Sequence, residues 1–192
     1  MMVALRPPEL CDLAEIEARI WHELDAAARS RGRDKNPHPW RISVMATVAD
    51  GLPQARLMVV REVDPTNREL VFFTDARSPK AAEIEREPRG VIVFWSPVLN
   101  WQLRVSARLE VQSTGLAVSS RWARLQHKAA ASDYVAALAP GRPLADVEDE
   151  LEGRTYFAVI TASVEAIDWL QLSGEGHQRA VFDAAGARHV QP

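Results

Sequence analysis

The segment from Asn100 to Gln112, NWQLRVSARLEVQ, constrains the fold of this chain most, because its apolar and polar residues alternate strictly. Successive side chains of a β-strand point to opposite faces, so this pattern predicts a long strand with two different faces. One face carries Leu103, Val105, Ala107, Leu109 and Val111, and the other carries Gln102, Arg104, Ser106, Arg108 and Glu110. The apolar face belongs to a core, and the polar face meets water, a ligand or a partner.

Further strands are predicted on both sides of this segment. Two β-rich runs in RISVMATVADGLPQARLMVVREV flank Asp50-Gly51, a strong hairpin signal. RELVFFTD and RGVIVFWS have strand composition, and TYFAVITASVEAIDWLQLS and HQRAVFDAAGARHV, separated by SGEG, predict a closing hairpin. Short antiparallel strands with interrupting helices predict a mainly β fold with α elements, a barrel or closed sheet with helices packed outside.

Three segments have helical patterns. Residues 9–31 place apolar residues at helical spacing before Gly32, SPKAAEIERE predicts a short helix ended by Pro88, and residues 114–139 are Ala-rich with helical spacing. APGRPLADVEDELEG is expected to be a loop with a short acidic helix. We treat residues 1–192 as a single domain with a leading helix in 1–32 and a helical insertion in 113–150.

Composition excludes several classes of protein. Hydrophobic residues make up 47% of the chain and no apolar run approaches the ~20 residues of a membrane span, while the net charge of −3 argues against a nucleic-acid-coating protein. No signal-peptide pattern is visible, so a cytoplasmic location is expected. Cys11 has no nearby partner, and His22, His38 and His189 have no acidic or histidine partner at ligand spacing, so no metal site is expected. No GxGxxG or Walker loop is present.

The segment FFTDARSPK carries an unusual charge at a predicted helix start. Ser78 is positioned as an N-cap and Pro79 as the first helical residue, yet Lys80 follows at once. A lysine near a positive helix terminus costs a few tenths of a kcal/mol, roughly, unless an anion faces it. The sequence alone is also compatible with a Lys80 side chain that extends into solvent.

Neighbouring residues favour the anion. Arg56 and Arg61 bracket the preceding strand in ARLMVVRE, and Thr74 ends the next strand. If these strands pair, the basic side chains and hydroxyls converge near the helix start, a combination that suits a phosphate. Arg56 and Arg61 are five residues apart, however, so in a regular strand they face opposite sides, and both reach one ligand only from different edges or across a bulge.

The order and spacing of these residues resemble a known family. The run ARLMVVREVD…LVFFTDARSPKAAEIEREPRGVIVFWSPVLNWQLRVSARLEV is similar to the core of the pyridoxamine 5′-phosphate oxidase family of FMN-binding split β-barrels. The resemblance covers residues 40–112, weakens through the helical middle and returns at DWLQLSGEGHQRAVF. It implies an antiparallel split β-barrel with peripheral helices, FMN as the cofactor, and a homodimer, because in that family FMN lies between two subunits.

The resemblance also implies the cofactor-binding residues. Those placed at the flavin phosphate are Arg56, Arg61, Thr74 and Lys80, and those placed near the ring are Leu57, Met58, Val59, Phe73, Gln102, Trp169 and Arg179. Ser78 joins the phosphate group by its own position at the predicted helix start. Pro79 replaces an arginine of the family pattern, so one phosphate contact is expected to be lost, and Phe73 stands where tyrosine is usual. Without the resemblance, Gln102 is interpreted as a residue on the solvent-exposed face of a strand, Trp169 as a core tryptophan and Arg179 as a surface arginine of the hairpin.

The family's substrate-phosphate site is not reproduced. Leu125 and Ala129 occupy positions where an arginine and a serine are expected, and Glu175 replaces the arginine before His177. A carboxylate in place of that arginine repels a substrate phosphate, so poor or absent activity on pyridoxamine or pyridoxine phosphate is expected. A shifted register through the helix would allow other basic residues to compensate, namely Arg121, Arg124, His127 or Lys128.

Two functions from different classes follow. In the first, the protein is an FMN-dependent oxidoreductase whose flavin accepts hydride from a small molecule, with Arg61 and Gln102 stabilising the reduced ring and His177 orienting a substrate or moving a proton. In the second, the same barrel is a non-catalytic flavin or haem carrier or a sensor. A dimeric barrel without a ligand is the third interpretation. The sequence predicts neither the substrate nor the electron acceptor.

Overall fold

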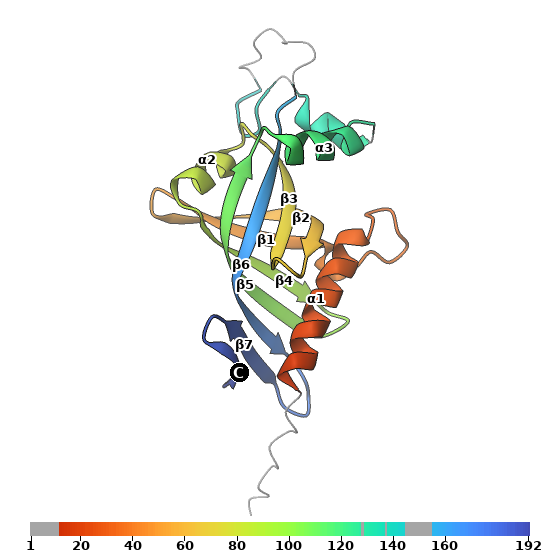
Figure 1. Cartoon of the computed structure of the whole chain (residues 1–192), viewed down its shortest axis with the longest axis vertical. Helices are drawn as coiled ribbons and strands as arrows, with labels where there is room; N and C mark the ends of the chain where they lie inside the picture. Colours follow the sequence, from red (N-terminus) through yellow and green to blue (C-terminus); the bar gives the residue numbers. More distant parts are fainter. Residues whose placement is uncertain (1–11, 128, 137, 145–154) are drawn as a thin grey trace, which may run out of the picture.

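Six antiparallel strands close into a barrel (Figure 1). The structure is a computed structural model and describes residues 12–127, 129–136, 138–144 and 155–192. The barrel strands are β1 (Ile42–Ala49), β2 (Leu52–Asp64), β3 (Glu69–Asp75), β4 (Arg89–Ser96), β5 (Trp101–Gln112) and β6 (Phe157–Gln171). They follow the order β3-β2-β1-β4-β5-β6, and pairing of β3 with β6 completes the closure. The predicted mainly β fold is confirmed.

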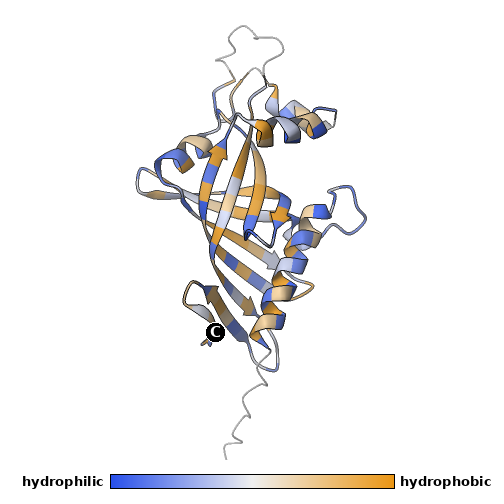
Figure 2. Ribbon diagram, viewed as in Figure 1, coloured by the Kyte–Doolittle hydropathy of each residue, from blue (hydrophilic) through white to orange (hydrophobic). Residues whose placement is uncertain are grey.

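Strand β5 has the two faces that its sequence predicts. Leu103, Val105, Ala107 and Leu109 are at most 2% exposed and point into the barrel, while the intervening polar residues point outward. Hydrophobic residues dominate the barrel strands, whereas the segment after the first helix is hydrophilic (Figure 2). The alternation of β5 therefore separates the core from an outer surface.

The hairpin between β1 and β2 forms at the predicted place. Asp50 and Gly51 have φ values of +50° and +78°, and Ala49 pairs with Leu52 across them. Two consecutive positive φ values match the twist of the flanking strands, which is why an Asp-Gly pair suits this turn. Further along β2, the register with β3 shifts between Val60 and Glu62, so Arg61 lies at a β-bulge.

In the described part of the chain, three α-helices pack around the barrel. They are α1 (Leu13–Arg29), α2 (Pro79–Arg86) and α3 (Leu116–Leu125), with shorter 3₁₀ turns η1 (Pro39–Arg41) and η2 (Ala129–Tyr134). Helix α1 begins at Asp12, whose side chain accepts a hydrogen bond from the Glu15 amide, and it buries Ile16, Ile20 and Leu24 in the barrel core. None of the helices in the described ranges combines the length and hydropathy of a membrane-spanning helix.

The C-terminal end of the chain extends the sheet beyond the barrel. Strand β7 (Gln178–Asp183) pairs with β6, as the closing hairpin predicts, and β8 (Gly186–Val190) adds a second hairpin that the sequence analysis did not resolve. Helices α1 and α3 fall within the predicted segments 1–32 and 113–150, and the assignment to one domain stays a prediction. The expected acidic helix falls largely on residues 145–154, outside the described residues, as does Cys11.

Candidate functional site

Helix α2 lies against one end of the barrel, and polar side chains from four elements meet beneath it. They are Thr47 of β1, Arg56 of β2, Thr74 of β3, and Ser78, Lys80 and Glu83 at the start and on the inner side of α2. We call these six residues the Lys80 cluster. The three strand residues share the inward parity of the core residues Met45, Met58 and Phe72. The cluster therefore closes one end of the barrel interior.

Lys80 is a partly buried cation that faces hydroxyl groups. Its Nζ donates to Thr74 Oγ1 at 3.2 Å, and the Thr74 and Ser78 hydroxyl oxygens are 3.1 Å apart. Burial, and then the positive charge of Arg56, lower the pKa of Lys80, an effect that Asp75 and Glu83 oppose. Within the described ranges no carboxylate forms an ion pair with Lys80. A desolvated ammonium group beside a helix start, without a paired counter-ion, favours an anion.

Ser78 does not act as the side-chain cap that its position predicts. It occupies the N-cap position of α2, but its side chain makes no capping hydrogen bond and its hydroxyl instead lies beside Thr74. Ser78 and Thr74 are 1% and 3% exposed, so both hydroxyls are held at the buried side of Lys80. The predicted position of Ser78 at the helix start is confirmed, but its hydroxyl does not cap the helix.

Arg56 is neutralised inside the cluster. One of its terminal nitrogens donates to Glu83 Oε2 at 2.7 Å, the other bonds to the Thr47 hydroxyl, and Thr47 Oγ1 donates to the same carboxylate at 2.5 Å. Sequence reasoning missed Thr47 and Glu83. The available signal was that Glu83 lies beside Ile84 on the buried side of a short helix, where an acidic residue requires a cationic partner. Because Glu83 balances Arg56, Lys80 carries the unpaired charge.

Arg61 does not join the Lys80 cluster. Met58 and Val60 point into the core, so strand alternation directs the Arg61 side chain to the outside of the barrel, where its guanidinium carbon lies 5.6 Å from the centre of the Phe73 ring. Phe73 packs in turn against Phe157, at 5.0 Å between ring centres. Arg56 and Arg61 thus face opposite sides of β2, as their spacing predicts, and the bulge at Arg61 does not unite them on one phosphate in this chain.

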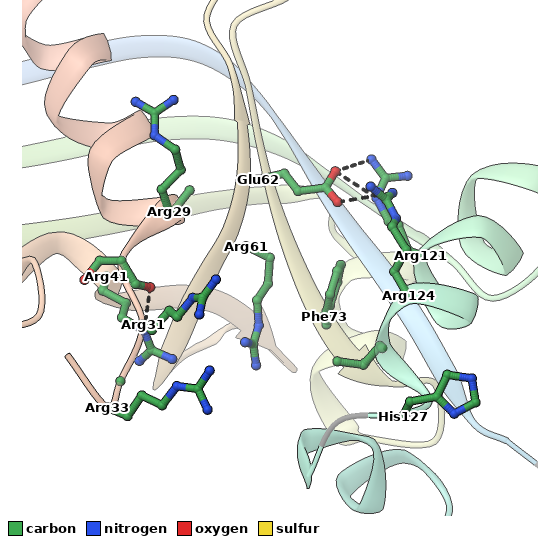
Figure 3. A pocket seen from close by; sticks show the side chains of 14 residues that line it. Arg29, Arg31, Arg33, Arg41, Arg61, Glu62, Phe73, Arg121, Arg124 and His127 are labelled. Atoms are coloured by element: carbon green, nitrogen blue, oxygen red, sulfur yellow. Dashed lines mark hydrogen bonds and ion pairs between the residues drawn. The ribbon is translucent and has the colours of Figure 1, made fainter.

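Arg61 and Phe73 instead line a second, open cavity of about 990 Å³ (Figure 3). We call this cavity the arginine pocket. Its charged and aromatic lining consists of Arg29, Arg31, Arg33, Arg41, Arg61, Glu62, Phe73, Arg121, Arg124 and His127. These residues come from the end of α1, the segment that follows it, β2, β3 and the α3 region. Lys128 lies outside the described residues.

Gln102, Trp169 and Arg179 form a separate group on β5, β6 and β7. Gln102 pairs with Leu170, which pairs with Arg179, so Gln102 and Arg179 share an outward face. Trp169 points the opposite way and is fully buried. Strands β1 and β4 lie between β5 and the strand that carries Arg56, so one chain does not unite this group with the Lys80 cluster.

Each member of this second group has a structural role. Arg179 donates two hydrogen bonds to the Asp168 carboxylate, at 2.9 and 2.7 Å, which raises the pKa of Arg179. The Trp169 ring packs edge to face on Trp101, at 5.2 Å between ring centres. These contacts are those of a surface ion pair and a core tryptophan, and a flavin contact by either residue stays a prediction.

The outer surface of the barrel over β1, β2 and β4 is apolar. Its residues are Ile42, Val44, Leu57, Val59, Val93 and Trp95, with Leu57 70% exposed and Trp95 44% exposed. We call these six residues the apolar face. Met58, between two of them on β2, points into the core instead. Of the three strand residues expected near a flavin ring, Leu57 and Val59 therefore have side chains on the outer surface.

The histidines do not form a metal site in the described part of the chain, where no group of three potential metal-ligating side chains occurs. His177 is exposed, and its Nδ1 accepts a hydrogen bond from the Ser173 amide at 3.1 Å, within the turn between β6 and β7. The expectation that His38 lacks an acidic partner is wrong. The fold brings Glu23 of α1 to 2.9 Å from His38 Nε2 across 15 positions of sequence.

Comparison with known sequences gives one family and a set of partial relatives. The family described as "Pyridoxamine 5′-phosphate oxidase, FMN-binding domain" matches residues 18–113. A pyridoxine/pyridoxamine 5′-phosphate oxidase of Thermosynechococcus vestitus is 38% identical over 74 residues, which is 38% of this chain and 34% of that protein. The corresponding protein of Trichormus variabilis is 35% identical over 90 residues, 47% of this chain and 38% of the relative. The matched region thus spans little more than a third of each relative.

Comparison with solved structures extends over nearly the whole chain. A pyridoxamine 5′-phosphate oxidase-related, FMN binding protein from Nostoc punctiforme has a TM-score of 0.67 at 23% identity, covering 96% of this chain and 99% of that one. PhzG from Burkholderia lata, solved with tetrahydrophenazine-1-carboxylic acid, has a TM-score of 0.69 at 14% identity and covers 99% of both chains. At these identities the similarity is one of fold.

Proposed function

The chain belongs to the family of pyridoxamine 5′-phosphate oxidase FMN-binding domains, and from this premise we propose that it is an FMN-dependent oxidoreductase acting on a small molecule. When bound, the flavin supplies a hydride acceptor. The protein's own part is to hold the phosphate, to fix the ring against the barrel surface and to admit a substrate beside it.

The observation that carries this proposal is the state of Lys80. Its ammonium group is partly buried, has a lowered pKa and faces the hydroxyls of Thr74 and Ser78 rather than a paired carboxylate. A phosphate monoester placed there would accept hydrogen bonds from all three side chains and supply the missing negative charge. Glu83 holds Arg56 beside them, which limits the conformations that Arg56 can adopt. The residues present therefore fit a flavin phosphate.

Replacing Lys80 by alanine tests the phosphate site directly. We expect FMN affinity to fall by about 10-fold to 100-fold, because a charge-assisted hydrogen bond contributes ~1.5–3 kcal/mol. The stability of the flavin-free protein should change little, since the folded protein already disfavours the charged ammonium. Quenching of FMN fluorescence and the visible absorption of the purified protein measure the effect.

Lys35→Ala is the matched control, because Lys35 is exposed in the segment after α1. Equal FMN affinity of Lys80→Ala and the unmodified protein would contradict the site. A Soret band in place of flavin absorption in the purified protein would favour the haem-carrier alternative over the oxidoreductase.

We expect the flavin ring and a second subunit to cover the same outer surface of the barrel. The apolar face is exposed, and contiguous exposed apolar surface of this kind commonly marks an interaction site. A flavin ring beside Leu57 and Val59 would cover part of it, and a second copy of this chain would cover the rest. Gln102 borders this surface, because it pairs with Trp95. In a homodimer the partner's copy of the Gln102 and Arg179 group would complete the ring site that one chain leaves divided.

Introducing a charge on the apolar face tests the dimer. Leu57→Asp is expected to convert the dimer to monomer at micromolar concentration and to release flavin, because a buried unpaired carboxylate at an interface is strongly unfavourable. Light scattering after size-exclusion chromatography reports the mass. Leu116→Asp adds the same charge at a residue that is 85% exposed on α3 and should remain dimeric. A Leu57→Asp protein that is still a flavin-bound dimer would exclude this face as the interface.

A further inference from the structure

The arginine pocket concentrates positive charge in an acidic protein. Seven arginines and one glutamate line it, a formal charge of 7 − 1 = +6, while the whole chain has a net charge of −3. Like charges in one cavity repel one another, and a cavity lined by them attracts ions of the opposite charge. The cavity therefore has the electrostatic character of an anion site.

Four of the seven arginines have carboxylate or carbonyl partners within the protein, and Arg61 has a side-chain hydrogen bond with the Tyr134 hydroxyl. Arg29 pairs with Asp25, and Arg41 Nε donates to the Ser30 carbonyl at 3.2 Å. Glu62 is shared by the remaining two, since Arg121 donates to it at 3.0 and 2.7 Å and Arg124 lies 3.8 Å from it. These contacts hold guanidinium groups on two sides of the pocket and engage Glu62, the only carboxylate among its described lining residues.

The other three guanidinium groups have no carboxylate partner in the described part of the chain. They belong to Arg31, Arg33 and Arg61, and Figure 3 shows them directed toward the same part of the cavity. The Arg61 guanidinium lies over the Phe73 ring, so an apolar surface adjoins the charged groups. Arg31 and Arg33 follow α1 in a segment that is distant from Arg61 in sequence, and only the fold brings them together.

We propose that the arginine pocket is the substrate site and that the substrate is a small molecule with at least two anionic groups, carboxylates or phosphates. This inference rests on the proposed oxidoreductase function and specifies the substrate class. Arg61 binds one anionic group and Arg31 with Arg33 binds the other, since each guanidinium is suited to paired hydrogen bonds with a carboxylate or phosphate. Phe73 contacts the apolar body of the molecule.

The dimensions and overall charge favour a small ligand. A cavity of about 990 Å³ is at the upper end of the size range of small-molecule sites. A nucleic acid would require an extended basic surface, and the remainder of this acidic chain does not supply the charge for one. A monoanion would leave most of the unpaired positive charge uncompensated.

The pocket adjoins the Lys80 cluster through strand β3. Phe73 and Thr74 are consecutive residues, and their side chains leave opposite faces of the strand, one toward the pocket and the other toward Lys80. Arg61 shares the outward face of β2 with Leu57 and Val59, so a flavin ring beside those two residues would approach the cavity. His127 also lines the pocket and adds an imidazole beside the guanidinium groups.

Titration of the purified, flavin-containing protein with citrate and with inorganic pyrophosphate tests the inference by calorimetry at low ionic strength. Citrate represents carboxylates and pyrophosphate represents phosphates, and acetate is the monoanionic reference. We expect at least one polyanion to bind at least 10-fold more tightly than acetate. The double variant Arg31→Gln/Arg33→Gln should lower the affinity for that polyanion at least 10-fold while its flavin absorption is unchanged.

Arg89→Gln/Arg188→Gln is the matched control. It removes the same two charges from arginines that are paired with Glu87 and Asp183 outside the pocket, and it should bind the polyanion within twofold of the unmodified protein. Equal affinity in the two double variants, or no preference of any polyanion over acetate, would overturn the inference. Flavin absorption tests the cofactor proposal separately. If the purified protein contained no flavin but still bound citrate, the proposed function would be contradicted while the anion site would be supported.

Discussion

Substituting methionine for Arg56 is expected to lower the free energy of unfolding by about 3 kcal/mol and to abolish flavin retention. Glu83 is 8% exposed and receives hydrogen bonds from Arg56 and Thr47. Without Arg56 its carboxylate keeps the Thr47 hydrogen bond but loses its ion-pair partner inside the barrel end, which is costly because a buried charge needs a partner. Chemical denaturation measures the stability of the flavin-free protein, and fluorescence titration measures its affinity for FMN.

The double variant Arg56→Met/Glu83→Met separates stability from cofactor binding. Replacing both members of a buried ion pair by apolar residues is often close to neutral, so most of the lost stability should return. Flavin affinity should stay at least 10-fold below that of the unmodified protein if Arg56 contacts the phosphate. Full recovery of FMN affinity in the double variant would show that Arg56 only balances Glu83 and that the phosphate contacts have been misassigned.

Replacing Trp169 by alanine is expected to destabilise the protein by about 3–5 kcal/mol, because the ring is fully buried and the cavity left behind would not be refilled. Its edge-to-face contact with Trp101 would also be lost. The Trp169 indole nitrogen is buried and has no hydrogen-bond partner among the described residues. The midpoint of denaturation should therefore fall far below that of any surface variant proposed above.

Trp169→Phe is the conservative comparison. Phenylalanine keeps most of the ring contact and removes the unpartnered N–H, so the loss of stability should be below about 1.5 kcal/mol. Unchanged FMN affinity in this variant would assign Trp169 to packing, in agreement with its burial in one chain. A loss of FMN affinity at nearly unchanged stability would instead support the flavin contact that the family resemblance implies.

Sequence patterns of short range were sufficient for most of the fold. The alternation in 100–112 predicts the two faces of β5, Asp50-Gly51 predicts the β1–β2 hairpin, and Ser78-Pro79 marks the start of α2. Each of these signals depends on residues within a few positions of one another, where side-chain direction and backbone preference are set locally. Their placement therefore follows from the sequence before any tertiary contact is known.

In the candidate site, too, the contacts between residues close in sequence could be predicted, and the contacts between distant residues could not. Lys80, Thr74 and Ser78 lie within seven positions of one another, and their convergence could be predicted from a strand end followed by a helix start. The partner of Arg56 could not, because Glu83 is 27 positions away and reaches it only after α2 packs on the barrel end. The outward direction of Arg61 followed from strand alternation, but its contact with Phe73 depended on the pairing of β2 with β3.

By itself, then, the sequence determined the strands, the helix starts and a basic, hydroxyl-rich group suited to phosphate. Only the tertiary structure decided that Glu83 neutralises Arg56, that Arg61 packs over Phe73, and that Arg31 and Arg33 meet it in a second cavity. The physical reason is range: hydrophobic periodicity is encoded in adjacent residues, whereas charge balance in a buried site depends on which distant segments barrel closure brings together.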